Sequence, residues 1–321
     1  MYIKESFPYK LSILLVTYNH EKHIRQALDA LISQEFDGKI ELVIADDCST
    51  DSTLSIIDEY KEKDPRFVFE YLDGETNLGI TRNYQRGFSA CSGEYIAVLE
   101  GDDYWSTPKK LKSQIEFLDT HWETSMCSVN YFVYQEEISH FYPRTTVGTG
   151  HKLISARDLI ADNLVGNFST CMYRNSVVKS LKEELYSIRS YDWIVNICAA
   201  EKAMIGFLEE PMSVYRLHGN GVWSQSPDVE KLQTQLDLIP LYDKLTEQIY
   251  HHEFSVLAHR LQENILALNI TDLAQPILQP AEKGRVVLVD IIPPILLSAI
   301  RLLTPPIIKR LILKATPRGV L

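Results

Sequence analysis

Three carboxylates stand close together in the segment VLEGDDYW, residues 98–105. Glu100, Asp102 and Asp103 follow directly on the apolar run YIAVL. Carboxylates at this spacing repel one another and raise each other's pKa unless a cation or a hydrogen-bond donor lies between them. The segment therefore predicts either a site that binds such a partner or a solvated turn that caps a helix starting near Thr107.

Short apolar runs alternate with segments of helical periodicity over the first hundred residues. The strand candidates are LSILLVTYN, IELVIADD, RFVFEYLD and EYIAVLE, and a helical segment follows each of the first three. This alternation predicts an α/β fold with a doubly wound, mostly parallel sheet. Ligands of such sheets bind outside the carboxyl ends of the strands. Polar clusters at residues 17–20, 46–51 and 100–103 follow strand ends, so we expect them to converge on one site.

Composition narrows the function classes. The chain has 321 residues and a formal net charge of −11, which argues against general nucleic-acid binding because phosphate contacts need a basic footprint. The five cysteines are scattered and never spaced as CxxC, which predicts reduced thiols rather than disulfides or a zinc site. The N-terminal apolar run is too short for a signal peptide, so we expect a cytoplasmic protein.

Six motifs follow one another along roughly residues 10–225, in the order LLVTYNH, LVIADDCSTDST, NLG, GEYIAVLEGDDYW, YDW and YRLHG. Together they resemble the family 2 glycosyltransferases, and the ordered set is far more specific than any one motif. The resemblance implies a GT-A (Rossmann-like) fold and inverting transfer of a sugar from a nucleotide-sugar donor. It predicts a catalytic domain over 1–225, with a nucleotide-binding half at about 1–105 and an acceptor half at about 106–225. A helical extension over 226–284 follows.

The resemblance assigns the acidic segment to a metal site of the DxD type. Asp102 and Asp103 match this element, with one carboxylate expected on Mn²⁺ or Mg²⁺ and the other nearer the donor ribose or a metal-bound water. Hard cations prefer carboxylate oxygen, and a cation stabilises the charge that gathers on a leaving nucleotide. His218, in YRLHG, is expected to complete the coordination. Glu100 stands where many relatives have Asp, and its role is left open.

The resemblance also implies a donor site at the strand ends. Asp47 is expected to hydrogen-bond the base and Tyr18 to pack on it, which favours a uridine or thymidine diphosphate sugar. The alternative for Asp47 is turn formation. Further donor contacts are predicted for Thr17, Asn19, Arg82 and Arg216.

Asp192, in SYDWIVNIC, matches the family's catalytic base at the start of a helix. It would remove the proton of the acceptor hydroxyl as that oxygen attacks the anomeric carbon from the face opposite the diphosphate. Relatives often read EDW, so Tyr191 departs from the pattern and leaves one acid fewer nearby. The helix dipole alone also favours an aspartate in the first turn, which is the structural alternative.

The tail, residues 285–321, carries six basic residues and one acid and contains the most apolar segment of the chain. Two Pro-Pro pairs, Asp290 and Arg301 interrupt it, so it falls short of a spanning helix of about 20 residues. Apolar residues mixed with basic ones over 286–316 suit an interfacial helix on an anionic membrane. This predicts peripheral attachment to the inner face of the membrane. In the alternative, the tail packs on its own domain or on the partner of a homodimer.

These features predict a metal-dependent, inverting hexosyltransferase that moves a sugar to a saccharide or lipid-linked acceptor in polysaccharide or lipopolysaccharide assembly. One rival is a sugar nucleotidyltransferase, which would need a glycine-rich phosphate loop after the first strand, whereas LLVTYNHEKH has no glycine. The other rival is a non-catalytic, membrane-associated scaffold with the same fold, and the motifs leave it open. The sugar and the acceptor depend on pocket shape, which motifs do not encode.

Overall fold

The computed structural model describes residues 7–188, 192–219 and 227–274, with residues 270–274 described by their backbone only. Residues 1–269 form one unit and residues 270–321 another, and the account below concerns the first. The whole predicted tail, residues 285–321, and residues 275–284 of the predicted helical extension lie outside the described residues.

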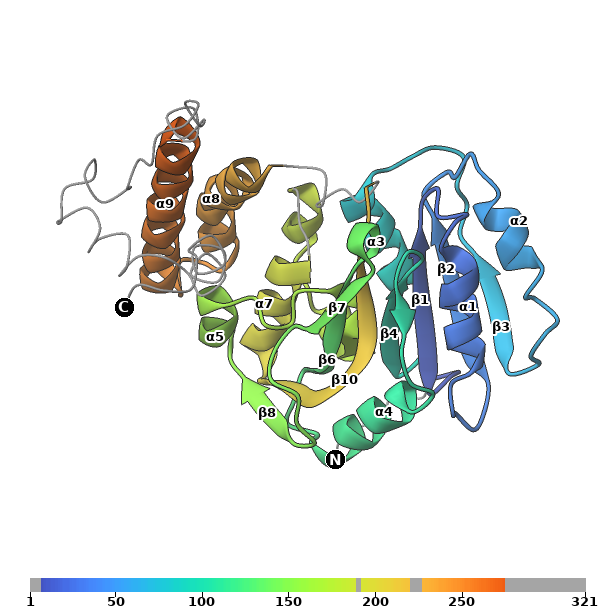
Figure 1. Ribbon diagram of the computed structural model, residues 1–321. Helices are drawn as coiled ribbons and strands as arrows, with labels where there is room; N and C mark the ends of the chain where they lie inside the picture. The colour runs from blue at the N-terminus through green and yellow to red at the C-terminus, as the bar shows by residue number, and fades with distance from the viewer. Residues whose placement is uncertain (1–6, 189–191, 220–226, 275–321) are drawn as a thin grey trace, which may run out of the picture. The chain divides into compact units, whose positions relative to one another are not determined.

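Ten strands of the described chain form one mixed sheet in the order β3-β2-β1-β4-β9-β6-β10-β5, with β7 paired to β6 and β8 to β10 (Figure 1). The first four strands of this order are mutually parallel, whereas β9 runs antiparallel to both of its neighbours. The strands are β1 (Leu11–Thr17), β2 (Ile40–Asp46), β3 (Phe67–Tyr71), β4 (Tyr95–Glu100), β5 (Tyr104–Trp105), β6 (Met126–Gln135), β7 (His140–Pro143), β8 (His151–Ile154), β9 (Cys171–Arg174) and β10 (Ile205–Leu217).

Helices cover both faces of this sheet. All seven residues of β1 are buried, and its side chains alternate between two cores, with Leu14 and Val16 in one and Ile13 and Leu15 in the other. Burial on both faces is typical of parallel strands in α/β proteins, so the predicted doubly wound fold is confirmed. The α-helices are α1 (Ile24–Ile32), α2 (Thr53–Asp58), α3 (Ile80–Ala90), α4 (Lys110–Thr120), α5 (Ala156–Ala161), α6 (Asn175–Lys179), α7 (Asp192–Lys202), α8 (Asp228–Leu245) and α9 (His251–Ala274), and the 3₁₀ turns are η1 (Glu136–Ile138), η2 (Phe168–Thr170) and η3 (Glu183–Ser187).

The second half of the chain is more continuous than its sequence suggests. AMIGFLEE and PMSVYRLH read as two strands, but they form the single strand β10, whose pairing with β6 is irregular around Pro211. Proline cannot donate a ladder hydrogen bond, so the strand accommodates it at a register shift instead of ending there. None of the helices in the part of the chain that the structure describes is long and apolar enough to cross a bilayer.

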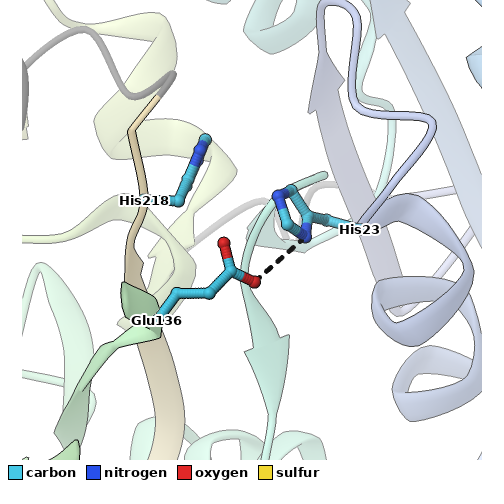
Figure 2. A group of neighbouring side chains, drawn as sticks. All are labelled: His23, Glu136 and His218. Carbon is cyan, nitrogen blue, oxygen red and sulfur yellow. Dashed lines mark ion pairs between the residues drawn. The ribbon is translucent and has the colours of Figure 1, made fainter. Parts of the chain in front are cut away.

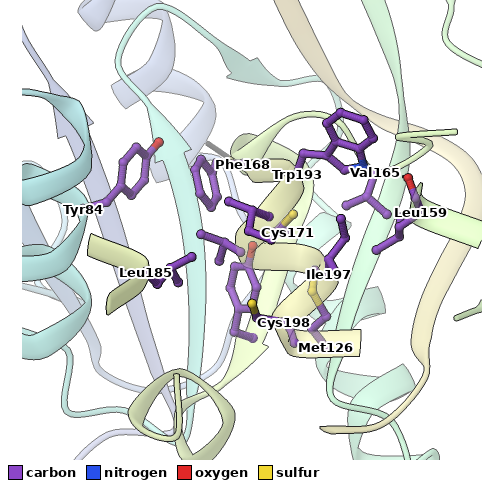
Figure 3. Packing of buried hydrophobic residues seen from close by; sticks show 14 of the residues in the cluster. Tyr84, Met126, Leu159, Val165, Phe168, Cys171, Leu185, Trp193, Ile197 and Cys198 are labelled. Atoms are coloured by element: carbon purple, nitrogen blue, oxygen red, sulfur yellow. Dashed lines mark hydrogen bonds between the residues drawn. The ribbon is translucent and has the colours of Figure 1, made fainter. Parts of the chain in front are cut away.

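Core packing anchors the helix that carries Asp192. Trp193 lies in the cluster shown in Figure 3, and its indole Nε1–H donates a hydrogen bond of 2.7 Å to the carbonyl of Leu159. Tyr242 of α8 packs edge-on against the Trp193 ring, with 6.4 Å between ring centroids. The start of α7 is therefore held in place by α5 and α8.

A second tryptophan anchors the acidic turn. Trp105 is buried, its indole Nε1–H donates to the carbonyl of Ser169 at 2.9 Å, and the Lys110 ammonium lies 4.4 Å from its ring centroid. This turn joins β4 to β5, so its direction depends on a contact with a segment more than sixty residues further along the chain.

Replacing Trp105 by Phe is expected to lower the free energy of unfolding by about 1–3 kcal/mol, because the buried Ser169 carbonyl loses its donor. Trp122, which is 82% exposed, supplies the matched control, and Trp122→Phe should change the same quantity by less than about 0.5 kcal/mol. Urea unfolding followed by circular dichroism measures both. Equal losses in the two variants would contradict the anchoring role of Trp105.

Candidate active site

A pocket of about 920 Å³ opens at the carboxyl ends of β1, β2 and β4. The loop before α1, the start of α7, the end of β10 and one face of α8 complete its wall. The three polar clusters that follow strand ends thus meet at one place, as the strand order predicts. The predicted site residues that line the pocket are Thr17, Tyr18, Asn19, Asp47, Asp102, Asp192, Arg216 and His218.

Asp103 does not line the pocket. Its carboxylate is 1% exposed and accepts three hydrogen bonds, from Asn167 Nδ2 at 2.9 Å, from Ser169 Oγ at 2.7 Å and from the backbone N–H of Arg216 at 2.9 Å. Burial, with the neighbouring Asp102 charge, raises the pKa of Asp103 to about 7. The sequence expectation placed Asp103 at the metal, whereas the structure turns its carboxylate into the protein.

Asp102 faces the pocket and lies among imidazoles. Its Oδ2 is 3.1 Å from Nε2 of His218 and 3.7 Å from Nε2 of His20. Burial by itself would raise the pKa of Asp102, but the two imidazoles outweigh that effect and lower it. The hydrogen bond to Asp102 in turn raises the pKa of His218. Asp102 is therefore held as a carboxylate.

A divalent cation fits between Asp102 and His218. Ligands at about 2.0–2.1 Å from a metal in octahedral geometry lie about 3 Å from each other, which is close to the separation of these two atoms. An oxygen and an imidazole nitrogen form a donor set that Mn²⁺ accepts. The residues present thus fit the cation that the sequence predicts.

Glu100 also lines the pocket. Its Oε1 accepts a hydrogen bond of 2.8 Å from the Tyr84 hydroxyl, and the Tyr84 ring stacks on Phe168 at 4.2 Å between centroids. Burial, followed by the charges of Asp103 and Asp102, raises the pKa of Glu100 well above its ordinary value. The shift of Glu100 is therefore opposite in direction to that of Asp102, whose pKa is lowered.

His23, Glu136 and His218 form a second group beside Asp102 (Figure 2). One ligand atom from each lies within 4.8 Å of the others, and His23 Nδ1 lies 3.9 Å from Glu136 Oε1. The Glu136 carboxylate is already ion-paired with Arg216, at 3.1 Å. Since that guanidinium neutralises the one carboxylate of the group, Asp102 with His218 is the better cation site.

The side of the pocket at the carboxyl ends of β1 and β2 is built around Asp47. Its two carboxylate oxygens accept the backbone N–H groups of Leu78 and Gly79, at 2.7 and 2.9 Å. Gly79 has φ of 79°, a conformation that favours glycine. Asp47 thus fixes the NLG segment as a turn, and each oxygen keeps a further lone pair for a ligand.

The residues after β1 form the rim of the same side. Tyr18 is 45% exposed, so its ring has an open face. Asn19 Oδ1 accepts the backbone N–H of Thr50 at 2.8 Å, which ties this rim to the loop after β2. Thr17 is buried, and its Oγ1 has no hydrogen-bond partner among the described residues. A buried hydroxyl without a partner is costly and points to a ligand or a water.

The two predicted arginines have different positions. Arg216 donates from Nε to the carbonyl of Asp102 at 2.9 Å and from Nη2 to Gln26 Oε1 at 2.5 Å. Arg82 does not line the pocket, and it donates from Nη1 to Gln85 Oε1 at 2.6 Å on its own helix. Arg216 therefore supports the acidic turn, whereas the structure does not bring Arg82 to the site.

Asp192 begins α7 and lines the pocket. Its Oδ1 accepts the backbone N–H of Trp193 at 2.7 Å, and burial raises the pKa of its carboxyl to about 6. No ion-pair partner for it occurs within the described ranges 7–188, 192–219 and 227–274. An uncompensated carboxylate with a raised pKa is suited to accept a proton near neutral pH.

His20 belongs to the polar cluster 17–20 that the sequence predicts at the site, whereas several other residues escaped the sequence reasoning. His23 follows the same strand end and lines the pocket. Glu136 does not line the pocket but pairs with Arg216, which does, and as one acid of an ordinary turn it gave no signal in the sequence. Gln235, Leu238 and Tyr242 reach the pocket from α8, and their helix carries no motif that could have pointed to them.

The family description "Glycosyl transferase family 2" matches residues 12–181. An uncharacterized protein of Mycobacterium tuberculosis, Rv1520, is 38% identical over 221 residues, which are 66% of this chain and 60% of that protein. The poly(ribitol-phosphate) beta-N-acetylglucosaminyltransferase TarS of Staphylococcus aureus is 34% identical over 113 residues, which are 35% of this chain and 19% of TarS. The chain thus spans less than two thirds of the length of these curated relatives.

Solved structures agree on the fold. The crystal structure of S. aureus TarS 1–349 in complex with UDP-GlcNAc matches with a TM-score of 0.57 and 21% identity, over 80% of this chain and 79% of that one. The mannosyltransferase PcManGT from Pyrobaculum calidifontis, in complex with GDP-Man and Mn²⁺, matches with a TM-score of 0.54 and 14% identity, over 87% and 86%. Both are GT-A glycosyltransferases, and the family match covers more than half of this chain. The chain therefore belongs to glycosyl transferase family 2 and has the GT-A fold.

Proposed function

We propose that this protein is a cation-dependent, inverting glycosyltransferase that takes a sugar from a UDP- or dTDP-sugar. The acceptor is a hydroxyl of a saccharide or of a lipid-linked saccharide in cell-surface glycan assembly. The observation that carries the proposal is one pocket that holds both a candidate cation-ligand pair, Asp102 with His218, and the carboxyl group of Asp192, which has no ion-pair partner among the described residues. TarS, which is named for transfer of N-acetylglucosamine to a poly(ribitol-phosphate), supports the same class of reaction.

Asp102 and His218 are the proposed cation ligands. The cation, when bound, would neutralise the donor diphosphate and stabilise the charge on the leaving nucleotide. Asp103 keeps the turn in place through its three hydrogen bonds, so that the Asp102 carboxylate points to the pocket. Arg216 supports the same turn and lends positive charge to the diphosphate side. Glu100 lines the pocket, and we assign it to the sugar or ribose hydroxyls of the donor, because its carboxyl oxygens can accept hydrogen bonds from them.

Tyr18 and Asp47 are the proposed contacts of the base. The open ring face of Tyr18 would stack on the pyrimidine, and an Asp47 oxygen would accept its N3–H. Thr17 supplies a hydroxyl without a partner, and Asn19 holds the rim that carries Tyr18. Arg82 receives no role, because its side chain is engaged on its own helix.

Asp192 is the proposed base. Its carboxylate would hold the acceptor hydroxyl and take its proton as the new glycosidic bond forms and the bond to the diphosphate breaks on the opposite face of the sugar. The anchoring of α7 through Trp193 keeps this carboxylate in place while the acceptor binds, and orientation of this kind makes a large contribution to rate.

A panel of nucleotide sugars, assayed for donor hydrolysis or transfer with Mn²⁺ and with a chelator, tests the proposal as a whole. Turnover with at least one pyrimidine diphosphate sugar, abolished by the chelator, is expected. Turnover that survives chelation would overturn cation dependence, and no turnover with any donor would favour the non-catalytic scaffold. Formation of a nucleotide sugar from a sugar phosphate and a nucleoside triphosphate would favour the nucleotidyltransferase.

Asp102→Asn should reduce kcat by about 10²–10³ and raise the Mn²⁺ concentration needed for half-maximal rate, because a charged ligand of the cation is lost. Its thermal midpoint should change little. Asp103→Asn should instead lower the thermal midpoint, since an amide nitrogen meets donors that the carboxylate oxygen accepted, at a cost of about 1–3 kcal/mol. A Mn²⁺ requirement that rises in Asp103→Asn while its thermal midpoint stays constant would reverse these roles.

The pH dependence of kcat should follow Asp192. The base acts only when deprotonated, so kcat should rise as pH increases through about 6 and then level off. Asp192→Asn should lose about 10²–10⁴ in kcat and lose this rise. Asp228→Asn, on the exposed start of α8, is the control and should keep both rate and profile. A wild-type profile retained in Asp192→Asn would remove Asp192 from the mechanism.

The predicted membrane contact of the 286–316 tail and the homodimer stay predictions, since that whole segment lies outside the described residues.

A further inference from the structure

The hairpin of β6 and β7 carries exposed aromatic side chains beside the pocket. Tyr134 on β6 pairs in register with Phe141 on β7 and, on its other side, with Arg216 on β10. Directly paired residues of neighbouring strands share a face of the sheet. Arg216, Tyr134 and Phe141 therefore form one row across three strands.

The rings of this row are stacked. The Tyr134 and Phe141 rings lie 4.2 Å apart between centroids, with 16° between their planes. The guanidinium carbon of Arg216 lies 5.4 Å from the Tyr134 centroid and 5.5 Å from that of Tyr104. We name Tyr104, Tyr134 and Phe141 the aromatic strip. Its rings are ordered by one another and by Arg216, so a ligand that packs on the exposed end of the strip, at Phe141, loses little additional side-chain entropy on binding.

The aromatic strip is continuous with the candidate active site through Arg216, which contacts two of its rings and also lines the pocket. The turn of the same hairpin also approaches residues that line the pocket. Its Glu136 is ion-paired with Arg216 and lies near His23 and His218 (Figure 2). The far end of the strip is open, since Phe141 is 48% exposed. A ligand that extends beyond the pocket at Arg216 therefore meets this surface.

The side chains in and around the aromatic strip favour some classes of extended ligand over others. Aromatic ring faces pack on the C–H faces of sugar rings, and the polar groups at their edges suit hydroxyls. The hairpin turn carries two acids, Glu136 and Glu137, and Arg144 beyond β7 is paired with Asp162 at 2.8 Å. These charges disfavour a polymer of phosphodiesters and an anionic membrane, which both need unpaired cations.

We propose that the aromatic strip binds the uncharged saccharide part of the acceptor, at sugar units beyond the one that receives the transferred sugar. The inference rests on the proposed function for the identity of the pocket. Binding at the aromatic strip, however, requires neither turnover nor a nucleotide sugar. An experiment can therefore refute saccharide binding at the strip without refuting the proposed function, and the reverse.

The test measures binding of the full-length protein to an array of uncharged bacterial surface glycans, phosphate-bearing glycans and anionic phospholipid vesicles. Wild type should bind at least one uncharged glycan, and Phe141→Ala should weaken that binding about tenfold. Phe141→Tyr should restore it, because a ring is restored. Trp122→Ala, which removes an 82% exposed ring elsewhere, should leave it unchanged.

Two further measurements distinguish glycan binding at the aromatic strip from the transfer reaction in the pocket. Asp192→Asn should keep glycan binding while losing transfer, and Phe141→Ala should raise the KM for the acceptor while leaving the affinity for UDP unchanged. The proposal is overturned if no uncharged glycan on the array binds, if Phe141→Ala and Trp122→Ala weaken binding equally, or if Phe141→Ala impairs only vesicle or phosphate-glycan binding. Tighter self-association of wild type than of Phe141→Ala, without glycan binding, would also overturn it by assigning the strip to a second copy of the chain.

Discussion

The three hydrogen bonds that Asp103 accepts hold the active-site pocket together. They join the turn after β4 to the side chains of Asn167 and Ser169 and to the backbone of Arg216, which lies 113 residues further along the chain. Buried donors without this acceptor would each carry a desolvation cost. The Asp103 carboxylate thus connects the first hundred residues of the fold to the half that carries β10.

The hydrogen bonds of Asp103 also explain how the neighbouring acidic side chains come to have different environments. Because Asp103 is turned inward, Asp102 is free to face His20 and His218 in the pocket. Glu100, whose pKa is raised by burial and by its acidic neighbours, meets the hydroxyl of Tyr84 instead. Asp192 meets no cation in the described chain, and its pKa is raised by burial alone. The environment of each carboxyl group, rather than its residue type, sets the direction of its pKa shift.

Parts of the pocket wall belong to elements outside the family motifs. One face of α8 contributes Gln235 and Leu238, and the β6–β7 hairpin places Glu136 against Arg216. Most of the motif residues lie at strand ends, where the fold dictates their position, whereas these residues are positioned by α8 and by the hairpin.

The sequence by itself determined the architecture of the first hundred residues and the convergence of three polar clusters. Both follow from local periodicity and from the rule that parallel strands present their carboxyl ends at one edge. It also identified Asp102, His218 and Asp192 as residues of one site, because ordered motifs report on a family. It did not resolve β10 as one strand, since Pro211 reads as a break and only the pairing with β6 shows a register shift.

Tertiary structure alone decided which of two adjacent aspartates faces the pocket. Sequence spacing is the same for both, and the choice depends on donors that β10 and η2 bring to Asp103 from distant parts of the chain. The exclusion of Arg82, the inclusion of α8 and the row of Arg216, Tyr134 and Phe141 have the same origin. Each depends on which side chains meet across elements that are far apart in sequence, and no local pattern of residues encodes that meeting.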